Sequence, residues 1–143
     1  MAQCNFLVID FEGEPSGALS ERGIKRSPLR DVASMIRSFH YAAHTALLEQ
    51  IDHGRLQGQA VGTASWARYW SAWVSAIFFK AYRQNLGTAP LLPARNEDLV
   101  VMLDAYLLSR AIYELGEELD KRPEWVKIPL EDMLELLQQS KDP

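Results

Sequence analysis

Apolar residues recur every three or four positions along most of the chain, which is the spacing of one face of a helix. The first such stretch begins at Ser27-Pro28, where serine suits a helix cap and proline suits the first turn. Its periodic apolar residues are Val32, Met35, Ile36, Phe39, Ala43, Ala46 and Leu47. The pattern therefore predicts a long helix over residues 28–52.

A second helix is predicted over residues 66–85, with Thr63 or Ser65 as its cap and Leu86-Gly87 as its end. Its apolar residues are mostly aromatic and share one broad face. They are Trp66, Tyr69, Trp70, Trp73, Ile77 and Phe78. We expect this stripe to pack into the core, and a platform on which sugar rings stack is the alternative.

Two further helices are predicted in the last third of the chain. Asn96 can cap the first of them, which extends to about residue 121, and Glu97 and Asp98 favour its positive end. Pro123 lies just beyond its end. A shorter helix is predicted over residues 130–139.

An apolar run near the start, residues 5–10, predicts a short strand that ends in acidic residues. Asp10, Glu12 and Glu14 alternate, so their side chains share one side of the chain while it stays extended. Carboxylate oxygens are ligands that Mg²⁺ prefers, and such a cluster can hold the ion beside a nucleotide. A solvated acidic turn is the alternative.

These patterns predict a mainly α protein, a helical bundle over residues 27–139 with a short N-terminal β element. The chain has 143 residues, which is room for a single domain with a modest core. Its share of apolar residues is 48% and its share of charged residues is 24%, as in ordinary globular proteins.

Charge and cysteine content narrow the range of partners and compartments. The net charge is −4 and no long basic run occurs, which argues against a nucleic-acid partner. The longest apolar stretch, residues 73–79, is too short to span a bilayer, so we expect no membrane partner. Cys4 is the only cysteine, and the start of the chain lacks the pattern of a signal peptide. Both features favour a cytoplasmic location.

Two blocks of the sequence carry a family resemblance. The first comprises Asp10-Phe11-Glu12-Gly13-Glu14-Pro15, residues 25–33, Arg37-Ser38-Phe39 and Tyr41-Ala42-Ala43. The second comprises Tyr113-Glu114-Leu115, Arg122-Pro123-Glu124-Trp125-Val126 and Ile128-Pro129-Leu130. Both resemble the bacterial maltokinases, which are often fused to trehalose synthase and belong to the aminoglycoside-phosphotransferase-like, protein-kinase-like superfamily. Residues 47–95 match that family only in general character.

The resemblance implies an intact enzyme that transfers the γ-phosphate of ATP to maltose, giving maltose 1-phosphate for trehalose and α-glucan metabolism. It implies that Asp10 binds Mg²⁺ on the nucleotide and that Glu12 is a second ligand or a hydrogen-bond partner. The family's glycine-rich loop, ATP-binding lysine and His-Gly-Asp loop are absent from the sequence. The catalytic base is therefore expected upstream of Met1. We expect one truncated kinase domain that is inactive alone and holds no ATP or Mg²⁺ tightly.

Tyr113, Glu117 and Arg122 are the candidates for binding the sugar. Tyr113 and Glu117 are four residues apart and so share a helix face. The resemblance implies a tyrosine near position 117 and an asparagine near position 120, where this chain has Glu117 and Asp120. These departures leave the identity of the sugar open.

The residues assigned to sugar binding can also be interpreted as purely structural. Tyr113 would then be a core residue, and Glu114, Glu117 and Glu118 would form a solvated face. The competing class for the whole chain is a non-catalytic helical module that binds a sugar or a protein. The sequence also predicts a homodimer, formed through the unpaired edge of the strand at residues 6–9 or through the aromatic helix.

His40 and His44 are four residues apart on the first predicted helix, a spacing that can chelate a metal ion. The only nearby candidates for a third ligand are Asp52 and His53. A structural role for the two histidines is the favoured interpretation.

Overall fold

The computed structural model describes residues 24–53 and 60–139. They form four α-helices and one short 3₁₀ helix, with no strand in these two ranges. The elements are α2 (Leu29–Asp52), α3 (Ala60–Leu86), α4 (Asn96–Lys121), η1 (Pro123–Trp125) and α5 (Lys127–Gln139). The prediction of a mainly α bundle is confirmed, and the predicted β element at residues 5–10 lies outside the described residues.

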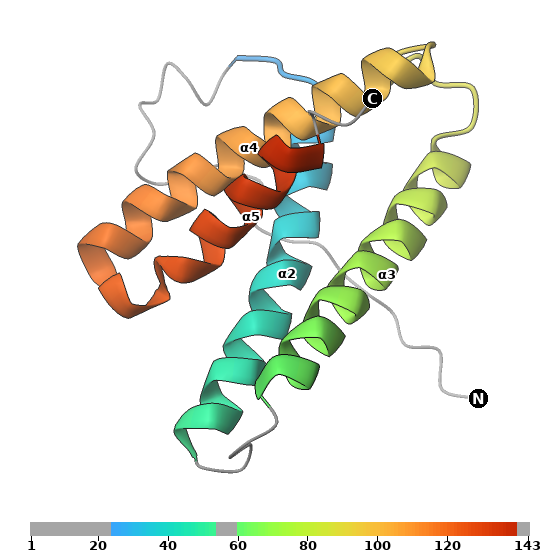
Figure 1. Cartoon of the computed structure of the whole chain (residues 1–143). Helices are drawn as coiled ribbons and strands as arrows, with labels where there is room; N and C mark the ends of the chain where they lie inside the picture. Colours follow the sequence, from blue (N-terminus) through green and yellow to red (C-terminus); the bar gives the residue numbers. More distant parts are fainter. Residues whose placement is uncertain (1–23, 54–59, 140–143) are drawn as a thin grey trace, which may run out of the picture.

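Helix α2 occupies the centre of the fold. It packs against α3 on one side and against α4 on the other, and α5 folds back beside α4 after the η1 turn (Figure 1). The core cluster joins Leu29 and Val32 of α2 to Leu99 of α4. Three aromatic residues of α3 also pack against this cluster, namely Phe78, Phe79 and Tyr82. Among these helices, none combines the length and the apolar character needed to cross a membrane.

The start of α2 follows the sequence rules. The Ser27 hydroxyl oxygen accepts a hydrogen bond from the Leu29 amide at 3.3 Å, and Pro28 lies between them. Ser27 therefore caps the helix as predicted, and it satisfies one of the amides that lack a partner within the helix. This cap fixes the point at which Leu29, fully buried, enters the core.

Three helix starts differ from the prediction. Helix α3 begins at Ala60, six residues early, and passes through Gly62. Helix α5 begins at Lys127 with Pro129 in its first turn, where a missing amide breaks no helical bond. Asn96 is the first residue of α4 rather than its cap, and Arg95 precedes it without a side-chain capping bond.

The expectation that the aromatic stripe of α3 packs into the core is wrong for most of its residues. Trp66, Tyr69, Trp70, Trp73 and Ile77 are each between 44% and 64% exposed. The side of α3 that is buried carries small residues at its N-terminal half, Ala67 and Ser71. Small side chains allow two helices to approach closely, and α3 uses that side against α2, which leaves the large rings outside.

Gly87 ends α3 in the left-handed conformation, with a φ of 57°. A side chain there would meet no other atom within 4 Å, so the cost of Gly87→Ala comes from the backbone alone. We expect Gly87→Ala to lower the free energy of unfolding by about 1 kcal/mol. Urea denaturation followed by circular dichroism measures this loss.

Gly116→Ala is the matched control. Gly116 lies inside α4, and a side chain there would also meet nothing within 4 Å. Alanine should stabilise the helix at this position by roughly 0.5–1 kcal/mol. If both substitutions changed the free energy of unfolding equally, that result would contradict the left-handed conformation of Gly87.

Candidate functional site

A buried network of charged side chains joins α2, α4 and α5. At its centre Arg37 is 3% exposed and donates two hydrogen bonds to Glu114 Oε2, from Nε at 2.8 Å and Nη2 at 2.6 Å. Its third nitrogen, Nη1, pairs with the carboxylate of Asp132 on α5. One guanidinium thus holds two buried carboxylates from two different helices.

The network continues along α4 through two more arginines. Arg110 Nε donates to Glu114 Oε1 at 3.2 Å. Glu118 is 2% exposed, and its Oε1 accepts from the Tyr41 hydroxyl at 3.0 Å and from Arg122 Nη2 at 2.7 Å. Each of the three buried carboxylates therefore pairs with an arginine, of which Arg37 is buried and Arg110 and Arg122 are partly exposed.

His40 adds a neutral imidazole to the network. Its Nε2 lies 2.7 Å from Asp132 Oδ1. Burial lowers the pKa of His40 to about 3, with smaller contributions from His44 and Arg37. The charge of Asp132 is already matched by Arg37, so the ring stays neutral and donates its Nε2 proton to Oδ1. The other nitrogen, Nδ1, is then an acceptor, and it is buried without a hydrogen-bond partner.

The His40–His44 pair is arranged as a structural contact. The two ring centroids are 3.9 Å apart, and His44 Nδ1 lies 3.0 Å from the backbone oxygen of His40. Within residues 24–53 and 60–139, no group of three histidine, cysteine, aspartate or glutamate side chains is placed to hold a metal ion.

The three residues predicted to bind the sugar belong to two separate sets of contacts. The Tyr113 hydroxyl lies 3.5 Å from Glu117 Oε1, and the Arg110 guanidinium stacks over the Tyr113 ring at 5.0 Å. Lys121 also pairs with Glu117 and, through that hydrogen bond, lowers the pKa of the Glu117 carboxyl. Arg122 instead binds Glu118 and covers the Trp125 ring at 4.3 Å.

The alternative of a solvated acidic face on α4 is wrong for two of its three glutamates. Glu114 and Glu118 are 9% and 2% exposed, and only Glu117 is half-buried at the rim. The reason lies in the helical spacing. Glu114 and Glu118 follow buried Ala111 at intervals of three and four, so they continue the buried stripe of α4.

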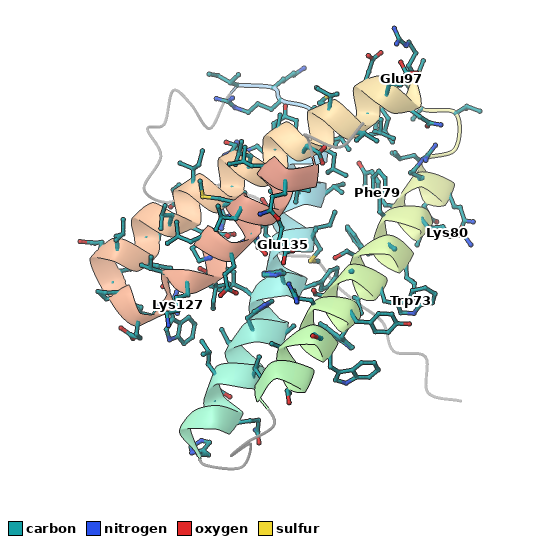
Figure 2. The ribbon with its side chains drawn as sticks, viewed as in Figure 1. Trp73, Phe79, Lys80, Glu97, Lys127 and Glu135 are labelled. Carbon is teal, nitrogen blue, oxygen red and sulfur yellow. The ribbon has the colours of Figure 1, made fainter. Side chains whose placement is uncertain are left out.

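A cavity of about 200 Å³ adjoins the network between α2, α3 and α5. Arg37, His40 and Asp132 contribute to its polar wall. Its apolar wall comprises Ile36, Ala72, Leu107 and Leu136. Arg68 of α3 and Glu135 of α5 also line it and form an exposed ion pair of 2.8 Å, and Figure 2 labels Glu135 on α5.

The sequence analysis did not identify Arg37, Asp132 or His40 as members of one site. The sequence did contain one indication of this site, because acidic residues occupy positions on helix faces that are otherwise buried. Asp132 follows buried Ile128 by four residues on α5, as Glu118 follows Glu114 on α4. A carboxylate at a buried position requires a cation, and Arg37 pairs with carboxylates of both helices.

The two metal-ligand candidates, Asp10 and Glu12, lie outside the described residues. What the described residues offer chemically is a charge-balanced network, a small adjoining cavity and the Tyr113–Glu117 pair on α4. No model of a known protein family matches the sequence.

Proposed function

We propose that this chain is the C-terminal helical lobe of a maltokinase-like sugar kinase. The intact enzyme would transfer the γ-phosphate of ATP to maltose or a related sugar in the cytoplasm. The observation that carries the proposal is the contact between the two blocks that resemble maltokinases. Arg37 belongs to the first block and Glu114 to the second, and they are joined by two buried hydrogen bonds across 77 positions.

Further contacts link the same two blocks. Tyr41 of the first block donates to Glu118, four residues after Glu114. Ile128 and Pro129 of the second block are buried. Several residues that carry the resemblance therefore take part in the contacts that hold α2, α4 and α5 together. This supports kinship in fold.

The proposed chemistry is phosphoryl transfer by positioning and charge neutralisation. Asp10, with Glu12 as a second ligand or hydrogen-bond partner, would hold Mg²⁺ on the ATP phosphates. The catalytic base would come from the part of the kinase that precedes Met1. Tyr113, Glu117 and Arg122 would face the sugar, since hydroxyl, carboxylate and guanidinium groups all form hydrogen bonds with sugar hydroxyls.

Reconstitution tests the proposal directly. The chain alone should show no transfer from ATP to maltose. We expect a hybrid to phosphorylate maltose with ATP and Mg²⁺ when residues 10–143 follow the N-terminal part of a maltokinase up to the residue before its Asp-Phe-Glu segment. Asp10→Asn should remove most of that activity, because the lost charge holds the metal ion, and Glu12→Gln should remove less.

Steady-state kinetics of the same hybrid separate sugar binding from nucleotide binding. Tyr113→Phe should raise the KM for maltose several-fold and leave the KM for ATP unchanged. A hybrid that binds ATP and is folded, yet transfers phosphate to no sugar, would contradict the kinase assignment.

A non-catalytic interaction module is the second candidate, and one observation favours it. The aromatic stripe of α3 is exposed, and the largest exposed apolar patch of a monomeric protein is often functional. Calorimetry with maltose and the chain alone distinguishes a sugar-binding module from a protein-binding one, since only the former should release heat on titration.

A further inference from the structure

The outer face of α3 is apolar and unpaired with any other described element. This aromatic stripe comprises Trp66, Tyr69, Trp70, Trp73 and Ile77. Figure 2 shows Trp73 projecting from the side of α3 that faces away from α2, while Phe79 points toward the interior. Helix α3 contains no aspartate or glutamate, and a helix that is apolar on both sides is normally covered on both.

The rings of the stripe stack on one another along the helix. Trp66 and Tyr69 have centroids 5.4 Å apart with planes 14° from parallel. Tyr69 and Trp73 are 6.4 Å apart at 10°. Near-parallel neighbouring rings cover part of each other's faces, so Trp66, Tyr69 and Trp73 form a continuous ridge along α3. Partly covered faces suit a protein surface better than a sugar ring.

The C-terminal half of the same face is hollow and positively charged. A shallow depression of about 510 Å³ is lined by Ala76, Phe79, Lys80, Arg83 and Gln84. Trp73, Ala76, Lys80 and Arg83 succeed each other at intervals of three and four, so ridge and hollow lie along one line. Figure 2 shows Lys80 projecting from the same side of α3 as Trp73.

We propose that the occupant of this face is a second copy of the chain, with the two α3 helices antiparallel. A two-fold axis near position 75 places Trp73 of each copy against Ile77 of the other. The same register sets the ridge of each copy into the hollow of the other, with Tyr69 opposite Lys80 and Trp66 opposite Arg83. Lysine and arginine are attracted to the faces of aromatic rings, so Lys80 and Arg83 of each copy suit the parts of the ring faces that the stacking leaves open.

The antiparallel arrangement follows from the distribution of charge. A parallel pair would set Lys80 against Lys80 and Arg83 against Arg83, with no acidic residue on α3 to compensate. An isologous antiparallel pair brings unlike halves together and closes after two copies. The pairing does not depend on the chain being part of a kinase.

The area of the surface is also adequate. The four rings, about half exposed, present roughly 400 Å² of surface. Ile77, Ala76 and the stems of Lys80 and Arg83 add to it, toward the about 800 Å² that each side of a specific interface contributes. A lipid surface is the other occupant that Trp and Tyr would suit, and vesicle binding tests it below.

Light scattering over a dilution series measures the pairing. The wild-type chain should have twice the monomer mass of 16.2 kDa, and Trp73→Glu should return it to the monomer mass. Trp73→Ala should raise the dissociation constant of the dimer by at least about tenfold, since a central aromatic residue dominates such interfaces. Val101→Glu is the matched control, because Val101 of α4 is 69% exposed and lies outside the stripe, and it should leave the dimer intact.

Cysteine cross-linking tests the register, in a background where Cys4, the only cysteine, is serine. Ala76→Cys lies near the proposed axis and should form a disulfide-linked dimer under mild oxidation. Gln84→Cys lies on the same face, but about 13 Å further along the helix, and should not. A parallel pair would cross-link both.

Three results would overturn the proposal. The first is a monomer at all concentrations, as would follow if a segment of the same chain covered the stripe. The second is cross-linking through Gln84→Cys. The third is a wild-type monomer that binds phosphatidylserine vesicles with a change in tryptophan fluorescence that Trp73→Glu abolishes, which would assign the face to a membrane.

Discussion

Replacing Arg37 by methionine should lower the free energy of unfolding by roughly 3–5 kcal/mol, which is a large part of the stability of a domain of this size. The aliphatic part of the side chain is kept, and only the guanidinium is lost. Glu114 would retain Arg110, but Asp132 would be left 93% buried with only a neutral imidazole beside it. Chemical denaturation of the variant measures this loss.

Two controls show that the loss comes from unpaired charge. Combining Arg37→Met with Glu114→Gln and Asp132→Asn removes all three charges and keeps an acceptor for Arg110 and for His40, so most of the stability should return. Arg95→Ala removes an arginine that is 69% exposed and pairs with Glu97, and it should cost less than about 1 kcal/mol. If the triple variant were no more stable than Arg37→Met, the loss of stability would come from the changed shape of the side chains and not from unpaired charge.

Acid should destabilise the chain through His40. Burial lowers the pKa of His40 to about 3, whereas an exposed histidine titrates near 6.5. As the pH falls below 6.5, the unfolded chain takes up a proton that the folded chain refuses until about pH 3. The contribution of His40 is therefore complete above pH 6.5 and is lost between pH 6.5 and pH 3, by on the order of 4 kcal/mol.

The matched variant for this experiment is His40→Gln. Its side-chain amide can donate to Asp132 as the imidazole does, but it does not titrate. The free energy of unfolding of the wild type, minus that of His40→Gln, should fall steadily as the pH is lowered from 6.5 to 4. His53→Gln alters an exposed histidine and should leave the wild-type profile unchanged. A difference between wild type and His40→Gln that is independent of pH would show that the pKa of His40 is the same in the folded and the unfolded chain.

Local signals predicted most of the helical framework. Ser27-Pro28 set the start of α2, Gly87 set the end of α3 and Pro123 set the end of α4, because each acts through the backbone of its own turn. Helix α5 starts three residues before its predicted start, because the first turn of a helix accepts Pro129.

Which face of a helix is buried was harder to predict. Helix α3 has apolar residues on both sides, so its periodicity groups Trp66 with Trp73 and Ala67 with Ser71 but does not say which group meets α2. The choice depends on how closely the helices approach, which is a property of both helices together. The ionic network was missed for a similar reason, because the partner that makes burial of Glu114 acceptable lies 77 positions away.

The Arg37–Glu114–Asp132 contact also constrains how this sequence can diverge. Losing the arginine first leaves the buried Asp132 carboxylate without a cation, and losing either acid first removes one of the two carboxylates that Arg37 binds. Each single substitution therefore gives a less stable protein, although replacing all three residues by uncharged ones would be tolerated. Among descendants of this chain the three identities should be inherited as a linked set, changing together or not at all.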